Sequence, residues 1–329
     1  MKQTSRLLIT TAVWMVFCSL ATANLGAAPI IFGSLGGQKG TSTNTGALVI
    51  INPVNAAITV IGVPSPGIGI SGLTFDSNGN LWGSTQVGGG IQPPPDTTTS
   101  NLIQINPLTG ALISSVPITT STGSSLSIAD LATQPGTNMI FGIQSPNDVN
   151  FNFPDANLYT ISKTTGVATL VGNTGVFFGS IAFAPNGTLY MTSADLAGTV
   201  TTVFACPVSD TAQTNCALST LNPTTAATLT SVGTADFYSA LGISNGGVIW
   251  AGNGAGDLGP GTGQFFAGIS TLNPATGAAT FIGNTGTDFV GDIAFVPTPE
   301  PASLALFGIG MGALLARRFR STVNSSAKR

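Results

Sequence analysis

The apolar residues of this chain fall in short runs that recur at a nearly constant spacing. The clearest marker is an apolar residue followed by Asn or Ser and, in four of its five copies, by Pro. The middle residue advances by 54, 56, 60 and 51 positions from copy to copy. The copies are Ile51-Asn52-Pro53, Ile105-Asn106-Pro107, Ile161-Ser162-Lys163, Leu221-Asn222-Pro223 and Leu272-Asn273-Pro274. A period of about 50 residues indicates a repeat architecture.

Three further apolar runs follow each of the first four markers, and two follow the last. The second of them, such as residues 180–183, leads in four repeats through a Gly-containing turn into the third, such as residues 189–191. Asn-Gly between apolar runs is a strong hairpin signal, and three of these turns contain it. Each repeat is therefore predicted to form four short strands.

Four-stranded repeats of this length are typical of β-propeller blades, which pack face to face in a closed ring. The last repeat lacks its fourth run, but Ile31-Phe32-Gly33 near the N-terminus matches Leu81-Trp82-Gly83. An N-terminal strand that completes the last blade would close the ring. We therefore expect an all-β fold, a five-bladed β-propeller of four-stranded blades over residues 24–296. A closed β-helix or a pair of β-sandwiches is the alternative.

One aromatic residue occupies the same position in every predicted blade. The five are Phe32, Trp82, Phe141, Tyr190 and Trp250. A large side chain at a fixed place in each repeat predicts packing between neighbouring blades. A platform on which sugar rings stack is the alternative.

The N-terminus has the order of a secretory signal peptide. Lys2 and Arg6 precede an apolar run over residues 7–20, and the small residues 21–23 follow it. This is the charged, apolar and A-x-A order of a signal that is removed after export. We expect residues 1–23 to be removed.

The C-terminal region carries a second targeting pattern. Pro299, Glu300 and Pro301 precede an apolar stretch over residues 302–316, which ends at Arg317 and Arg318. Fifteen residues of helix span about 22 Å at 1.5 Å per residue, less than the roughly 30 Å of a bilayer core. We expect a single short hydrophobic helix in a segment over residues 297–320, followed by a polar tail over residues 321–329.

This order of Pro-Glu-Pro, short apolar helix and Arg cluster resembles the PEP-CTERM sorting signal. The resemblance implies processing by an exosortase, transient insertion of the helix in the inner membrane, and display on the outer surface or in the extracellular matrix of a Gram-negative bacterium that makes exopolysaccharide. The body resembles exported NHL- or YVTN-like propellers. If the tail were kept uncut, a membrane-anchored receptor would be the alternative.

Charge is scarce in the predicted body. It contains eleven Asp, two Lys, no Arg and no His. Nucleic acid and anionic membranes are disfavoured as partners because phosphate groups attract clustered Lys and Arg. Common hydrolase mechanisms lack a His base. We expect a non-enzymatic structural or adhesive protein without a cofactor, whose partners are exopolysaccharide or other matrix proteins.

Four Asp residues are the candidates for a metal site. Asp130 and Asp292 share one repeat position, and Asp236 and Asp288 share another, four residues earlier. Carboxylates around one end of a propeller channel would suit Ca²⁺, which takes oxygen ligands. The alternative function is then a periplasmic or extracellular enzyme or a calcium-dependent binder. Ordinary turn or loop residues are the simpler interpretation.

Two cysteines, Cys206 and Cys216, remain after removal of the signal peptide, which contains Cys18. Two cysteines ten residues apart in an exported protein predict a disulfide that staples a loop. A reactive thiol or a metal pair would need further partners, and the chain has no His and no additional Cys outside the signal peptide.

Overall fold

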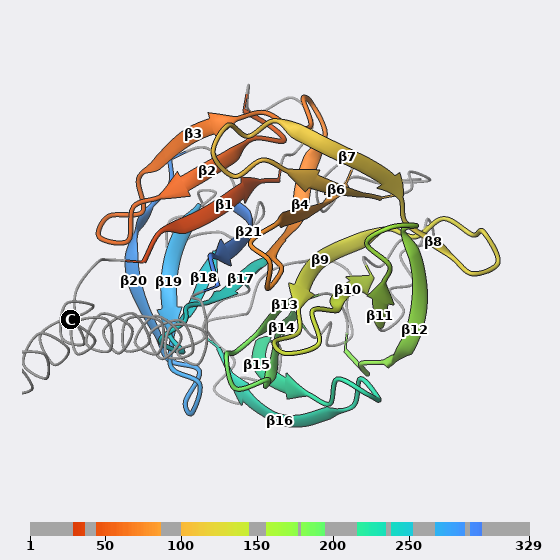
Figure 1. Cartoon of the computed structure of the whole chain (residues 1–329). Helices are drawn as coiled ribbons and strands as arrows, with labels where there is room; N and C mark the ends of the chain where they lie inside the picture. Colours follow the sequence, from red (N-terminus) through yellow and green to blue (C-terminus); the bar gives the residue numbers. More distant parts are fainter. Residues whose placement is uncertain are drawn as a thin grey trace, which may run out of the picture.

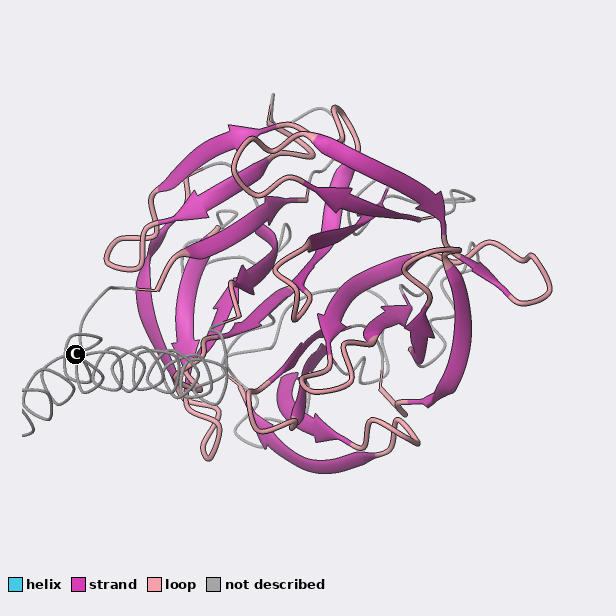
Figure 2. Ribbon diagram, in the orientation of Figure 1, coloured by secondary structure: helices cyan, strands magenta, loops and turns pink. Residues whose placement is uncertain are grey.

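A computed structural model describes residues 29–36, 44–86, 100–144, 156–176, 179–194, 216–234, 238–252, 267–286 and 290–297. These residues form 21 strands in five sheets. The sheets stand side by side in a ring (Figure 1), and Figure 2 shows strands and connecting loops without helices in the described part of the chain. The fold is the expected five-bladed β-propeller with four-stranded blades. The predicted signal peptide and C-terminal helix lie outside the described residues.

Within each blade, neighbouring strands pair antiparallel, and the chain runs from the centre of the ring to its rim. Blade 1 is β21 (Val290–Phe295), β1 (Ile31–Leu35), β2 (Leu48–Ile51) and β3 (Ile58–Gly62). Blade 2 is β4 (Gly69–Phe75), β5 (Leu81–Gln86), β6 (Asn101–Ile105) and β7 (Leu112–Pro117). Blade 3 is β9 (Ile128–Thr133), β10 (Ile140–Gln144), β11 (Asn157–Ile161) and β12 (Val167–Asn173). Blade 4 is β13 (Gly179–Phe183), β14 (Leu189–Ala194), β15 (Cys216–Leu221) and β16 (Thr228–Gly233). Blade 5 is β17 (Ala240–Ile243), β18 (Ile249–Gly252), β19 (Gly268–Leu272) and β20 (Ala279–Asn284).

Blade 1 joins the two ends of the propeller. The N-terminal strand β1 lies between β2 and the last strand, β21, with Phe32 opposite Ile50 on one side and Ala294 on the other. The prediction that an N-terminal strand completes the last blade is confirmed. Because the closing contacts join the two ends of the body, this blade needs both ends of the chain in order to form.

The recurrent marker forms the turn between the third and fourth strand of each blade. In blade 1, Asn52 accepts a hydrogen bond from the backbone N–H of Val54 at 2.8 Å, an Asx turn. The fifth residue of the marker turn has a positive φ in every blade, and in blade 1 this residue is Ala56. The equivalent residues are Gly110, Gly166, Ala226 and Gly277. The turn therefore reverses the chain in the same way five times.

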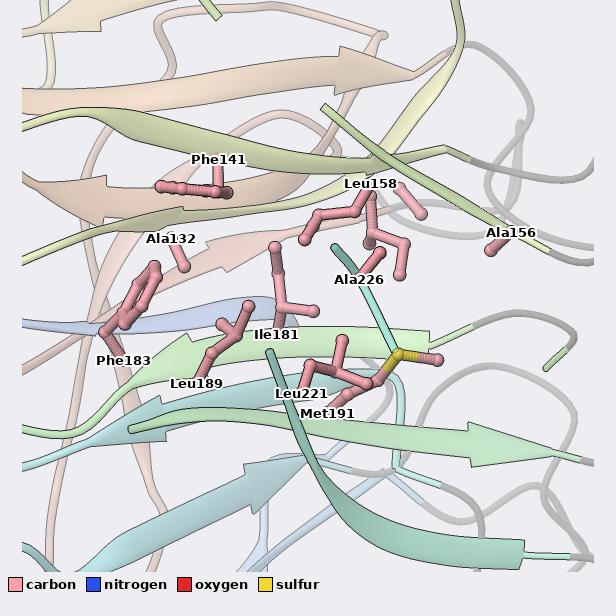
Figure 3. Close-up of a cluster of buried hydrophobic side chains, with 12 residues drawn as sticks. Ala132, Phe141, Ala156, Leu158, Ile181, Phe183, Leu189, Met191, Leu221 and Ala226 are labelled. Carbon is pink, nitrogen blue, oxygen red and sulfur yellow. The ribbon is translucent and has the colours of Figure 1, made fainter. Parts of the chain in front are cut away.

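The core consists of five separate apolar clusters, one at each interface between neighbouring blades. Figure 3 shows the cluster between blades 3 and 4, where Phe141 and Leu158 of blade 3 face Ile181 and Met191 of blade 4. Each blade thus buries both of its faces against neighbours. This is the reason why a single repeat has no independent core.

The repeated aromatic residues belong to these clusters. Phe32, Trp82 and Trp250 are each 7% exposed. Phe32 of blade 1 packs edge-to-face on Phe75 of blade 2, with ring centroids 5.2 Å apart, and Phe141 of blade 3 repeats this contact with Phe183 of blade 4 at 5.3 Å. The expected inter-blade packing is confirmed, because burial leaves no face of these three rings open to a sugar.

The sheet of blade 3 holds a strand that the repeat pattern does not predict. The two-residue strand β8 (Thr119–Thr120) pairs parallel with the outer strand β12. It comes from the connection between blades 2 and 3. No helix of the described residues has the length and apolar character needed to cross a bilayer.

Candidate functional site

The centre of the ring is formed by one equivalent position on each innermost strand. These positions hold Gly72, Asp130, Ser180, Ala240 and Asp292. A Cβ atom on Gly72 would lie 2.5 Å from the backbone nitrogen of Leu131, so β4 passes too close to β9 for a side chain there. Small residues on three strands leave room for the two aspartates, whose side chains fill the centre and are 0% exposed.

The two carboxyl groups accept the backbone amides of all five innermost strands. Asp292 accepts the N–H groups of Leu73 at 2.5 Å, Ile293 at 2.7 Å and Leu241 at 3.3 Å. Asp130 accepts those of Ile181 and Leu131, both at 2.6 Å. Each donor is the residue that follows the central position of its strand. The fold therefore directs five equivalent N–H groups inward, where a buried donor without an acceptor would cost free energy.

These hydrogen bonds connect every blade. Asp292 ties blade 1 to blades 2 and 5, and Asp130 ties blade 3 to blade 4. The hydroxyl of Ser180 also donates to Asp130. The two carboxyl groups, one from blade 1 and one from blade 3, also interact electrostatically across the centre. We call the pair and its five amide donors the central clasp.

Burial controls the protonation of the pair. It raises the pKa of Asp130 to about 7, although hydrogen bonds from Asp292, Ser180 and the backbone oppose the shift. It raises the pKa of Asp292 well above the ordinary value of 3.8, and the negative charge on Asp130 adds to the increase. Both shifts follow from the cost of placing charge away from water.

The candidate metal residues divide into two groups. The expectation that Asp130 and Asp292 line a channel mouth is wrong, because both lie inside the ring with their oxygens turned to N–H donors. Asp236 and Asp288 lie outside the described residues. Among the residues that the structure describes, no three potential ligands of the types His, Cys, Asp and Glu come together. Calcium binding stays a prediction.

A third buried carboxyl group, that of Asp76, lies between blades 2 and 3. Asp76 follows β4, and its Oδ2 accepts the Nζ of Lys163, 3.0 Å away in blade 3. The same oxygen accepts the indole N–H of Trp82 and the side-chain amide of Asn80, both at 3.1 Å. Burial raises the pKa of Asp76, but these hydrogen bonds outweigh it and hold the pKa below its usual value. This group is committed to an inter-blade ion pair.

The remaining predicted site residues lie at or beyond the limits of the described chain. Cys216 begins β15, is buried, and is disulfide-bonded, whereas Cys206 lies outside the described residues. The pairing of these two cysteines stays a prediction. The sorting residues Pro299, Glu300, Pro301, Arg317 and Arg318 also lie outside.

The C-terminal segment matches a known family. Residues 297–321 match the PEP-CTERM protein-sorting motif. This confirms the resemblance seen in the Pro-Glu-Pro and Arg pattern. The motif supports export, processing by an exosortase and a place at the cell envelope. None of the curated proteins matches the chain.

The solved structures that are similar to this chain share little sequence identity with it. Hydrazine synthase of Kuenenia stuttgartiensis has 13% identity and a TM-score of 0.38 over 64% of this chain and 48% of that one. A protein of unknown function from Bacteroides caccae has 14% identity and a TM-score of 0.45 over 82% and 100%. TolB of Acinetobacter baumannii has 13% identity and a TM-score of 0.44 over 78% and 53%. The chain thus spans about half the length of the first and third of these structures. Similarities of this size carry no argument about the function of this chain.

Proposed function

We propose that this propeller with a PEP-CTERM motif is a non-enzymatic protein of the bacterial outer surface or extracellular matrix, with a structural or adhesive role. The observation that carries the proposal is the sorting motif at residues 297–321, directly after a closed propeller. The motif accounts for the sorting of the chain to the cell envelope. The propeller supplies a rigid body for display.

The chemistry of the described residues supports a role without catalysis. Asp130 and Asp292 are buried and occupied by backbone donors, and Asp76 is paired with Lys163. These four are the Asp and Lys residues of the described part of the chain. Each of them serves contacts between blades. A general acid or base needs access to a substrate, which the three buried carboxyl groups lack.

The rim of the ring supports a role in contact with polysaccharide. The outer strands β3, β7, β12, β16 and β20 contain no charged residue. Their exposed polar residues carry hydroxyl or amide groups: Thr59, Ser114, Ser115, Thr169, Asn173, Thr228, Thr230, Ser231, Thr280 and Asn284. Hydroxyl groups donate and accept hydrogen bonds, as sugar hydroxyls do. An uncharged rim also avoids repulsion from an anionic polysaccharide.

Co-sedimentation with the exopolysaccharide of the host and with intact cells tests the proposal. We expect the exported chain to bind at least one of them, and Thr280→Asp on the outer strand β20 to weaken that binding at least several-fold. The control is Asn78→Asp in an exposed turn, which adds the same charge at a position that tolerates Asp. If the chain binds neither, an adhesive role is wrong. If calcium raises the melting temperature and a chelator lowers it, the calcium-dependent alternative takes its place.

A further inference from the structure

Ionisation of both carboxyl groups of the central clasp would be unfavourable. Its two carboxyl groups are 0% exposed and lie close enough for the charge on Asp130 to act on Asp292. Two ionised carboxylates cannot form a hydrogen bond with each other, because neither has a proton to donate and both are acceptors only. Like charges so close together, and away from water, also repel strongly.

No cation of the described residues offsets the charge. Among the residues that the structure describes, Lys163 is the one basic residue. It forms an ion pair with Asp76, away from the centre of the ring. The innermost strands β4, β13 and β17 carry no titratable side chain, and β9 and β21 carry only Asp130 and Asp292 themselves. Among the second strands β1, β5, β10, β14 and β18, the one titratable residue is Tyr190, which packs against the cluster between blades 4 and 5. Asp76 directly follows β4.

We propose that Asp130 and Asp292 share a proton, and that this proton makes the central clasp a pH-sensitive lock on the five blades. In the locked state one carboxyl donates its O–H to the other, while both accept the inward amides. Loss of the last shared proton removes that hydrogen bond and leaves two buried negative charges in contact. The lock therefore loosens as the pH rises.

The direction of the pH effect follows from linkage. Burial raises the pKa of Asp130 to about 7 and that of Asp292 well above its usual value, so the folded chain holds protons that the unfolded chain has released. Stability from this source is complete below the unfolded pKa of about 3.8 and is lost as the pH rises through the folded values. Each proton held only by the folded state makes unfolding about tenfold more favourable per pH unit.

Infrared spectroscopy of the purified exported chain at pH 7 tests the shared proton without any mutation. An Asp residue in water is ionised at this pH, so the carbonyl band of a protonated carboxylic acid reports a buried carboxyl. We expect this band in the exported chain at pH 7, and its loss as the pH rises through the folded pKa values. Absence of the band in the unaltered chain would overturn the proposal. A band that is absent until a chelator is added would assign the pair to a cation instead.

Urea unfolding between pH 4.5 and 8 tests the lock. We expect the unfolding equilibrium constant of the exported chain to rise by about tenfold or more per pH unit between pH 5 and 7. Asp292→Asn keeps the shape of the side chain and should give a shallower slope. Asp76→Asn is the control. The pKa of Asp76 lies below its usual value, so Asp76 stays ionised between pH 5 and 7, and its replacement should leave the slope in this window unchanged. Equal slopes in the unaltered chain and Asp292→Asn would contradict the lock. If Asp292→Asn does not fold, Asp130→Asn takes its place, and the infrared band of the unaltered chain decides.

Discussion

Trp82 donates its indole N–H to the carboxylate of Asp76, 3.1 Å away, inside the interface between blades 2 and 3. Trp250 occupies the same position in blade 5, but its indole nitrogen is buried without a hydrogen-bond partner among the described residues. The two tryptophans therefore share a packing role and differ in one polar contact. Their equivalence offers a direct comparison.

The first prediction compares Trp82→Phe with Trp250→Phe. Trp82→Phe removes a hydrogen bond to a charged group, for which we expect a loss of about 1.5–3 kcal/mol in the free energy of unfolding. Trp250→Phe removes a donor that has no acceptor, which offsets part of the lost packing, and we expect a loss below about 1 kcal/mol. Urea unfolding at pH 7 measures both. Equal losses would show that the bond to Asp76 contributes nothing.

The second prediction concerns ring closure. Phe32 lies in the strand that joins the ends of the propeller, is 7% exposed, and packs on Phe75. Phe32→Ala should lower the free energy of unfolding by about 3–5 kcal/mol. Ile30→Ala is the control, since Ile30 directly precedes β1 and is 60% exposed. It should change stability by less than about 0.5 kcal/mol. If the two variants match, the closing strand does not stabilise the ring.

The third prediction concerns the marker turns. Gly277 of blade 5 has a φ of 70°, and a Cβ atom there would lie 2.0 Å from the carbonyl oxygen of Gly233 in blade 4. Gly277→Ala should therefore cost more than about 2 kcal/mol, from left-handed strain and from displacement of the rim.

The matched variant is Ala226→Gly. Ala226 already has a φ of 62°, and its methyl group is buried between blades 3 and 4. Loss of the methyl costs about 0.8 kcal/mol and relief of strain returns about 1 kcal/mol, so the net change should stay below about 1 kcal/mol. Thermal unfolding of both proteins measures the contrast. A large loss in Ala226→Gly would mean that its methyl packing outweighs the strain.

The fourth prediction concerns the hydroxyl group that supports the central clasp. Ser180 donates to Asp130, and burial raises the pKa of that carboxyl to about 7. Above this pH the acceptor is ionised, so Ser180→Ala should cost about 1.5–3 kcal/mol, and at pH 5 only about 0.5–1.5 kcal/mol. Ser127→Ala is the control, because the buried Ser127 hydroxyl has no partner in the described part of the chain. A cost of Ser180→Ala that is independent of pH would separate Ser180 from the titration of Asp130.

Much of the fold can be predicted from the sequence because the turns repeat. The marker turns recur in all five blades and the hairpin turns in four of them, and the order of apolar runs between them specifies four strands. The match between Ile31-Phe32-Gly33 and Leu81-Trp82-Gly83 predicts the closing strand correctly. The strand β8 is not predictable in this way, because it occurs in one blade and its pairing with β12 depends on the path of a single loop.

The two aspartates of the central clasp can be found from the sequence, but its backbone donors cannot. Asp130 and Asp292 share a repeat position, which singles them out, but their role depends on backbone N–H groups that no side-chain pattern reveals. The signal that could have shown it is the full set at that position: two Asp among Gly72, Ser180 and Ala240. Small residues beside two carboxyls indicate a crowded interior more than a channel mouth.

The most direct test of the central claim is the intact mass and cellular location of the product, after expression of the full-length gene in a host that has an exosortase. We expect a chain that begins near Asn24, ends near Pro299, and is found outside the inner membrane. A product that retains residues 302–316 and stays in the membrane fraction would contradict it. The tail would then be an anchor, and a membrane-bound receptor would be the better description of this propeller.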